Sequence, residues 1–161
     1  SDFIWGRVGP RLKLREPLDL EKPLAVRLRL RPGDHRPEGH LVAVSMRGYH
    51  LVLVCDPFGP QAWFGSGDLT ALLRHVQDGD AVVPSGFRKR PFNGLADAAE
   101  SLIELELGAT SLERLAINGE TIDFPRFLEK PRSADPFLRL RSAKPMVLLD
   151  AELRGERKGT K

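Results

Sequence analysis

The sequence predicts an α+β domain, mainly an antiparallel β-sheet arranged as a sandwich or a partly closed barrel, with one packed α-helix near residues 68–78. About ten short segments have the alternating or continuous apolar pattern of strands. One segment has a clear helical period, and the strand–helix–strand rhythm of a parallel sheet is absent. The length of 161 residues suits a single domain over residues 1–153, followed by a basic, frayed tail over residues 154–161.

The first strands are expected at residues 3–5, 11–15 and 24–31. The third is the clearest, because apolar residues alternate with a second set that contains three arginines. The apolar set is Leu24, Val26, Leu28 and Leu30, and the other set is Ala25, Arg27, Arg29 and Arg31. This strand should therefore have one buried face and one charged face.

Residues 41–46 and 50–55 predict a β-hairpin at the centre of a sheet. Both segments are apolar on both faces, so we expect them to be covered on both sides. Arg47-Gly48 is the favoured two-residue turn, because glycine accepts a positive φ angle. This turn sets a register in which Val44 lies opposite Leu51, and His40 lies opposite Cys55.

Residues 69–77 predict the helix, after a short strand at residues 62–64. Its apolar stripe is Leu69, Leu72, Leu73 and Val76. Asp68 or Ser66 should cap its N-terminus, and Gly79 should end it. Ordinary capping explains Gly65-Ser66-Gly67-Asp68, because the lysine of a phosphate-binding loop is missing.

The remaining elements are less regular. Residues 81–83 predict a strand, residues 84–97 an irregular stretch and residues 96–101 one or two helical turns. Glu104 and Glu106, on one face of a strand at residues 102–107, should lie in water and face arginines of a neighbouring strand. Asn118-Gly119 is the strongest hairpin signal, and the final strands are expected at residues 137–141 and 146–149.

Composition excludes several classes of protein. The longest apolar runs are too short for a membrane span, so no membrane partner is expected. A single cysteine excludes an internal disulfide framework and a multi-cysteine metal site, and the four histidines lack metal-ligand spacing. We therefore expect no metal and no cofactor. Without a secretory leader we expect the chain to be intracellular, either cytoplasmic or nuclear. The start at Ser1 indicates a processed chain or an excised domain.

Charge is unevenly distributed although the net charge is only +3. Residues 97–123 hold seven acidic residues and one basic residue, and the segments on either side are basic. The basic residues with neighbouring aromatics are Arg27, Arg29, Arg31, Phe87, Arg88, Lys89, Arg90 and Phe92. Arg139 and Arg141 add a second basic strand. Cationic grooves with aromatic stacking platforms are typical of proteins that bind single-stranded nucleic acid.

The primary functional prediction is a non-enzymatic binding or regulatory module that engages RNA or single-stranded DNA. Its arginines and Lys89 would neutralise phosphates, and Phe87 and Phe92 would stack on bases. Two alternatives stay open. One is a protein-interaction or self-association domain that pairs the acidic segment with basic surfaces. The other is a cysteine-dependent hydrolase that uses Cys55 and His40, with Asp56 or Asp68 orienting the imidazole.

Overall fold

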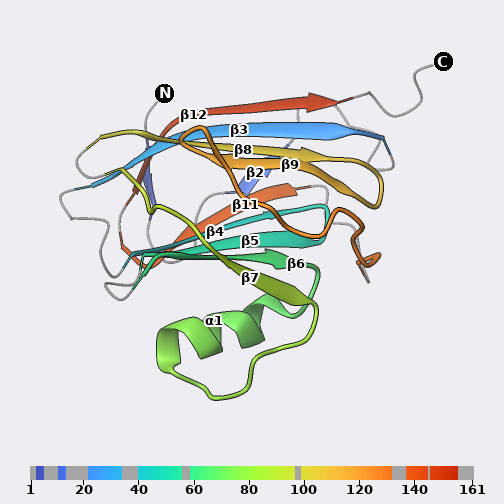
Figure 1. Ribbon diagram of the computed structural model, residues 1–161. Helices are drawn as coiled ribbons and strands as arrows, with labels where there is room; N and C mark the ends of the chain where they lie inside the picture. The colour runs from blue at the N-terminus through green and yellow to red at the C-terminus, as the bar shows by residue number, and fades with distance from the viewer. Residues whose placement is uncertain are drawn as a thin grey trace.

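The computed structural model describes residues 3–5, 11–13, 22–33, 40–55, 59–96, 99–131, 137–144 and 146–155. Within these ranges the chain forms two stacked antiparallel sheets and one helix, α1 (Leu69–Asp78), which lies outside the stack (Figure 1). The predicted fold class is confirmed. Of the two expected arrangements, a sandwich and a partly closed barrel, the structure has the sandwich. Across the part of the chain described, no helix combines the length and the apolar character needed to cross a bilayer.

Each sheet has six strands. Sheet A has the order β1-β12-β3-β8-β9-β10 and contains β1 (Phe3–Trp5), β12 (Met146–Gly155), β3 (Leu24–Pro32), β8 (Ser101–Leu107), β9 (Leu112–Ile117) and β10 (Glu120–Thr121). Sheet B has the order β2-β11-β4-β5-β6-β7 and contains β2 (Arg11–Lys13), β11 (Phe137–Ser142), β4 (His40–Met46), β5 (Tyr49–Cys55), β6 (Gln61–Gly65) and β7 (Phe87–Pro91).

The main core fills the space between the sheets. Every second residue of the long strands points into it, and Leu28 of β3 and Leu53 of β5 are both fully buried there. This alternation is the one that the sequence shows for β3. It leaves the opposite face of each sheet to be solvated or covered by another element.

The predicted hairpin of β4 and β5 is confirmed in its register. Val44 pairs with Leu51 and His40 pairs with Cys55, although the side chain of His40 lies outside the described part of the chain. The turn residues Arg47 and Gly48 have φ angles of 58° and 85°.

Arg47 also connects the hairpin turn to sheet A. Its side chain is only 2% exposed and donates hydrogen bonds to the carbonyl oxygens of Gly108 (3.0 Å) and Lys22 (2.6 Å). Gly108 follows β8 and Lys22 precedes β3, so this arginine joins one end of sheet B to strands of the other sheet. Hydrogen bonds from a charged donor to buried carbonyls are among the stronger ones in proteins.

Helix α1 covers part of the outer face of sheet B. The Asp68 side chain accepts a hydrogen bond from the Ala71 N–H, and Gly79, with φ 74°, donates its N–H to the Arg74 carbonyl, so both expected caps are present. The apolar stripe of the helix packs on the sheet, where Leu72 (0% exposed) and Trp63 (6%) belong to a second apolar cluster. Sheet B is therefore buried on both faces where α1 lies.

Three glycines hold the start of α1 close to the segment before β7. A Cβ atom at Gly65 would lie 1.8 Å from the Gly86 carbonyl oxygen, and one at Gly67 would lie 2.2 Å from the Ser85 carbonyl oxygen. The Ser66 N–H donates to the same Gly86 oxygen at 3.1 Å. These backbone contacts need glycine because any side chain would separate the two segments.

Some expected elements differ from the structure. The segment 81–83 is not a strand, and Val82 and Val83 are 71% and 52% exposed. Residues 87–91 are strand β7 rather than a flexible loop, because the backbone of β6 gives this polar segment its pairing partner. The described part of residues 96–101 contains no helix. Strand β12 continues to Gly155, past the expected start of the tail, and residues 156–161 lie outside the described part.

Gly65→Ala should reduce the free energy of unfolding by at least about 2 kcal/mol, because the new methyl group would overlap the Gly86 carbonyl. Gly119→Ala is the matched control. It has a φ angle of 83° but nothing within 4 Å of the added atom, so only backbone strain of about 1 kcal/mol is expected. Urea unfolding of both variants measures the difference. Equal destabilisation would contradict the close packing described for Gly65.

Candidate functional site

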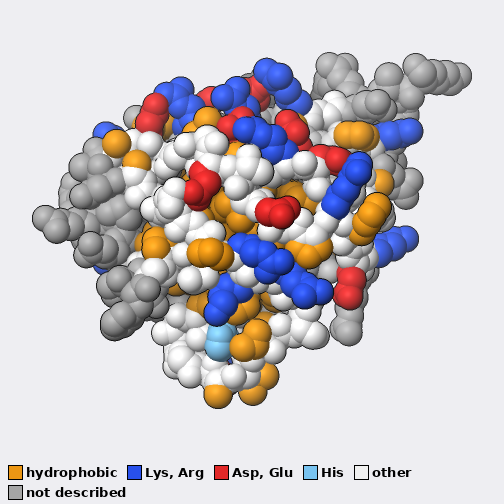
Figure 2. Space-filling view, in the orientation of Figure 1, with side chains coloured by type: hydrophobic (Ala, Val, Ile, Leu, Met, Phe, Trp, Pro, Cys, Tyr) orange, Lys and Arg blue, Asp and Glu red, His pale blue; other side chains and the backbone are white. Residues whose placement is uncertain are grey.

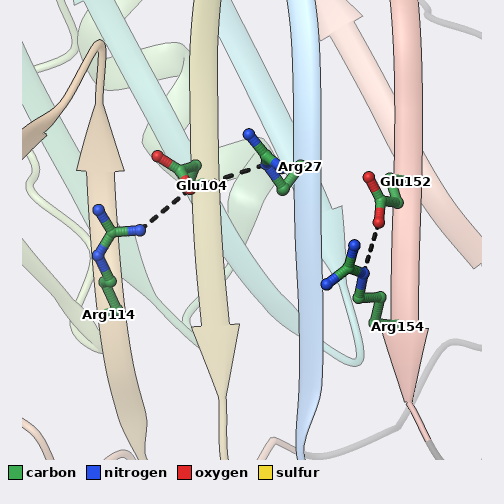
Figure 3. A network of polar contacts seen from close by, with 5 residues as sticks. All are labelled: Arg27, Glu104, Arg114, Glu152 and Arg154. Atoms are coloured by element: carbon green, nitrogen blue, oxygen red, sulfur yellow. Dashed lines mark hydrogen bonds and ion pairs between the residues drawn. The ribbon is translucent and has the colours of Figure 1, made fainter.

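The arginines of β3 lie on the outer face of sheet A, where carboxylates face them. Figure 3 shows Glu104 of β8 between Arg27 and Arg114, at 3.7 Å and 3.1 Å. The backbone register places Glu104 directly opposite Arg27. The expected pairing of Glu104 with an arginine of the neighbouring strand is thus confirmed.

The same pattern continues along sheet A. Arg29 forms two hydrogen bonds of 2.7 Å to Glu100, and this interaction raises the pKa of the Arg29 guanidinium. Arg154 is paired with Glu152 at 2.5 Å (Figure 3), and Arg31 is exposed at the end of β3. In Figure 2 basic and acidic side chains are interleaved over sheet A, at the top of the view. This face is a charge-balanced surface rather than a continuous cationic one.

The basic residues of β7 belong to the other sheet and are divided between its two faces. Arg88 and Arg90 pair with Phe64 and Ala62, which face the main core, whereas Lys89 pairs with Trp63 on the outer face. Arg90 lies over Phe124, with its guanidinium carbon 5.7 Å from the ring centroid. Lys89 lies over Trp63, with its ammonium nitrogen 5.4 Å from the ring centroid.

The two phenylalanines predicted to stack on bases are packed into the protein. Phe92 is 6% exposed and belongs to the core between the sheets. Phe87 is half-buried and packs with the cluster beneath α1. Neither ring is open for stacking on a base. The two phenylalanines and the basic residues of β3 and β7 do not lie on one continuous surface.

Cys55 also lies in the main core. It is 4% exposed, and burial raises the pKa of its thiol, which a backbone hydrogen bond from Leu95 only partly offsets. A nucleophilic cysteine needs the opposite shift, toward the thiolate. Asp56 and the side chain of His40 lie outside the described part of the chain, so the proposed triad is not assembled there.

The outer face of sheet B carries a polar row beside α1. Cross-strand pairing places Arg139 of β11 opposite Ser45 of β4, Ser45 opposite His50 of β5, and His50 opposite Gly65 of β6. Phe87 of β7 pairs with Gly65 and completes the row. The next row along the sheet contains Ala43, Val52 and Trp63 and is the apolar one under α1.

Arg139, Ser45 and His50 of this row line the floor of a groove of about 830 Å³. Its polar lining comes from the sheet, the start of α1 and two connecting segments, and includes Ser45, His50, Ser66, Asp68, Thr70, Ser85, Glu129, Lys130, Arg139 and Arg141. The Gly65, Gly67 and Gly86 contacts described above fix the wall that α1 and residues 84–86 form. In the described ranges no cluster of three or more histidine, cysteine or carboxylate residues has the arrangement of a metal site.

A short hydrogen bond orients the imidazole in the groove. Ser45 Oγ and His50 Nδ1 lie 2.6 Å apart, and Ser45 itself is 8% exposed. The His50 ring also lies against Phe87, with 6.3 Å between the ring centroids. With one ring nitrogen bonded to Ser45 and one edge against Phe87, His50 is held in a defined orientation, which favours specific recognition of a ligand.

A second groove, of about 540 Å³, lies at the edge of the sandwich between β7 and β10. Arg90, Asn93 and Glu120 in its lining form hydrogen bonds across it. Arg90 donates to the Asp123 carbonyl at 3.1 Å, and the Asn93 amide is hydrogen-bonded to the Glu120 carboxylate. These bonds join the edges of the two sheets, so this groove has a structural role.

The groove on sheet B was not predicted as a site from the sequence. Arg139 and Arg141 were noted as basic residues and His50 as one of four histidines, but Ser45 carried no signal. The available signal was the hairpin register, since extending the predicted Val44–Leu51 pairing by one residue places Ser45 opposite His50. The position of β11 beside β4 is not encoded in any local pattern.

Comparison with known proteins gives structural neighbours but no sequence family: no family model and no curated protein matches the chain. Sheep galectin-11, in a complex with glycerol, has a TM-score of 0.57 at 11% identity over 91% of this chain and 97% of its own. The carbohydrate recognition domain of Emp46p, in a potassium-bound form, has a TM-score of 0.59 at 14% identity over 96% and 88%. This chain is similar to them in fold.

A third neighbour is the alginate lyase AlyC3 in complex with dimannuronate. It has a TM-score of 0.56 at 10% identity over 99% of this chain and 75% of the lyase. Identities of this size establish a shared β-sandwich fold and do not by themselves transfer a function.

The prediction of an RNA- or single-stranded-DNA-binding module is therefore wrong. The chain has the fold of a galectin and of carbohydrate recognition domains. The physical premise also fails, because Arg27 and Arg29 are paired with Glu104 and Glu100 and the β7 residues lie on sheet B.

Neither the protein-interaction domain nor the cysteine-dependent hydrolase, the two alternative predictions, is confirmed. For the protein-interaction alternative, the structure shows only that Glu104 and Glu113 of the acidic segment pair with Arg114 and Arg126 inside the domain. The burial of Cys55 and its raised thiol pKa do not support the cysteine-dependent hydrolase.

Alkylation of Cys55 by iodoacetamide at pH 7.5 should be about 100-fold slower in the folded protein than in urea. The raised pKa keeps the thiol protonated at neutral pH, and the thiolate of the folded protein forms only at a pH above the usual cysteine range. Mass spectrometry of timed samples measures both rates. Equal rates with and without urea would show that Cys55 is accessible and ionised, contrary to this structure.

Proposed function

We propose that this domain binds carbohydrate in the groove on the outer face of sheet B. The observation that carries the proposal is the polar row of Arg139, Ser45 and His50, which lies next to the apolar row of Ala43, Val52 and Trp63 that α1 covers. The fold, which is similar to that of a galectin and of carbohydrate recognition domains, supports the same assignment.

The side chains in the groove suit hydroxyl-rich ligands. A sugar hydroxyl both donates and accepts hydrogen bonds, and so does the Ser45 hydroxyl, whereas the guanidinium of Arg141 supplies several donors in one plane. The imidazole of His50 donates or accepts according to its tautomer. Groups of this kind, held at fixed positions, distinguish the orientations of neighbouring hydroxyls on a sugar ring.

The size and the walls of the groove support binding of a small ligand. Its volume of about 830 Å³ lies in the range of small-molecule sites, roughly 300–1,000 Å³. The floor consists of strands in the middle of a six-stranded sheet, so its side chains need little reordering when a ligand binds. Arg27 and Arg29 of sheet A are engaged with carboxylates, and Arg90 at the β7–β10 edge joins the two sheets.

A panel of neutral and acidic oligosaccharides, immobilised on an array and then titrated in solution, tests the proposal. We expect at least one sugar to bind the wild-type domain. His50→Ala should weaken that binding at least about tenfold, because a hydrogen bond to a sugar hydroxyl is lost in a partly buried site.

His75→Ala is the matched control. His75 lies on α1 against Trp63, with 5.7 Å between the ring centroids, and it is not part of the groove. Its substitution should leave sugar affinity unchanged, and thermal unfolding checks that both variants are folded. Absence of binding across the panel, or equal affinity of His50→Ala and the wild type, would refute the proposal.

A further inference from the structure

Apolar side chains are exposed next to the groove on sheet B. Among the residues that the structure describes, three large hydrophobic side chains are exposed, namely Val82 (71%), Val83 (52%) and Phe127 (80%). Val82 and Val83 directly precede residues 84–86, which line the groove, and Phe127 lies two residues before the lining segment 129–131. Because consecutive Cα atoms are about 3.8 Å apart, each of the three has its Cα within roughly 8 Å of that of a lining residue. These three residues are called the apolar rim below.

The valines of the apolar rim lie on a short loop whose two ends are fixed. This loop connects α1 to β7 and is at the bottom of Figure 1. At its start the Asp80 carboxylate accepts the Val82 N–H at 3.1 Å. At its end the Gly86 carbonyl accepts the Ser66 N–H at 3.1 Å. The backbone thus holds Val82 and Val83 beside the groove wall while their side chains are in water.

Phe127 is also held in place. The Leu128 N–H donates to the Thr110 carbonyl at 2.9 Å, which joins this segment to the residues before β9. The Arg126 guanidinium carbon lies 5.8 Å from the centroid of the Phe127 ring, and Arg126 is paired with Glu113 at 3.2 Å. The ring therefore has a neighbour on one face and is otherwise exposed to water.

The groove and its rim together suit a ligand with a polar part and an apolar part. Ser45 and His50 on the floor supply hydrogen-bonding groups, whereas the side chains of the apolar rim supply none. Leu69, Pro84 and Pro131 add apolar groups to the lining itself. Covering exposed apolar surface is favourable in proportion to the area removed from water, and apolar groups around a groove are typical of ligand sites.

We propose that the apolar rim is a subsite for the apolar aglycone of a glycoside, whose sugar is bound in the groove. This inference rests on the proposed function and specifies its ligand class. The hydroxyl groups of the sugar bind to the floor, and the aromatic or alkyl group linked to the sugar contacts Val82, Val83 and Phe127. Substitutions of these side chains suit a test, because changes at exposed positions have little effect on stability.

Isothermal titration with the methyl and p-nitrophenyl glycosides of glucose, galactose and mannose tests the subsite. For at least one sugar, we expect the p-nitrophenyl glycoside to bind at least about tenfold more tightly than the methyl glycoside. Its binding should also have the more negative heat-capacity change, because more apolar surface leaves water.

The double variant Val82→Ser, Val83→Ser and the single variant Phe127→Ser should each lower the affinity for that p-nitrophenyl glycoside at least about threefold and leave the methyl glycoside unchanged. Leu102→Ser is the control. It removes an aliphatic side chain from the outer face of sheet A, where Leu102 pairs with Arg29, and should change neither affinity. Thermal unfolding confirms that the variants fold.

Three results would overturn this inference while leaving carbohydrate binding in place. They are equal affinity for methyl and p-nitrophenyl glycosides, an unchanged preference in either rim variant or an equal loss in Leu102→Ser, and no binding of the six glycosides by a domain that binds a sugar of the wider panel. Failure of the six glycosides together with failure of the wider panel would instead refute the proposed function itself.

Discussion

The close backbone packing of Gly65, Gly67 and Gly86 is the constraint on which the site depends. Sheet B has two largely apolar faces, one of which is buried against sheet A. The other face is covered by α1 over the row that contains Ala43, Val52 and Trp63. The glycine contacts fix where α1 begins, so the row of Arg139, Ser45 and His50 stays beside the helix instead of beneath it. A groove results because the helix covers only part of a wide sheet.

Much of this architecture could be predicted from local patterns. The β4–β5 hairpin has its predicted turn and register because Arg47-Gly48 accepts two positive φ angles. Helix α1 has its predicted caps because Asp68 and Gly79 act within a few residues of chain. Strand β7 was not predicted, since its charged residues and Pro91 do not resemble a strand, and the backbone of β6 supplies the pairing. The segment 81–83 was predicted as a strand from its valines, yet it has no partner strand and is exposed.

The functional prediction failed because charge was counted without pairing. Arg27, Arg29 and Arg31 form a basic strand face in the sequence, but β8 lies next to β3 and brings Glu104 opposite Arg27. The sequence predicted that Glu104 faces arginines of a neighbouring strand, but the distance along the chain between β3 and β8 hides that these are the arginines assigned to nucleic acid. The same limitation applies to the groove, whose floor combines β11 with β4 and β5, more than 80 residues apart. Arg139 and Ser45 become neighbours only through sheet order, which depends on the packing of the whole domain.

The central claim is that the groove on the outer face of sheet B binds a glycan. A crystal structure of the domain with the tightest oligosaccharide from the binding panel tests it most directly. The account predicts electron density for the sugar between the start of α1 and β11, with His50 and at least one of Arg139 and Arg141 within hydrogen-bond distance. Density for the sugar on the outer face of sheet A, or at the β7–β10 edge with the sheet B groove empty, would contradict it.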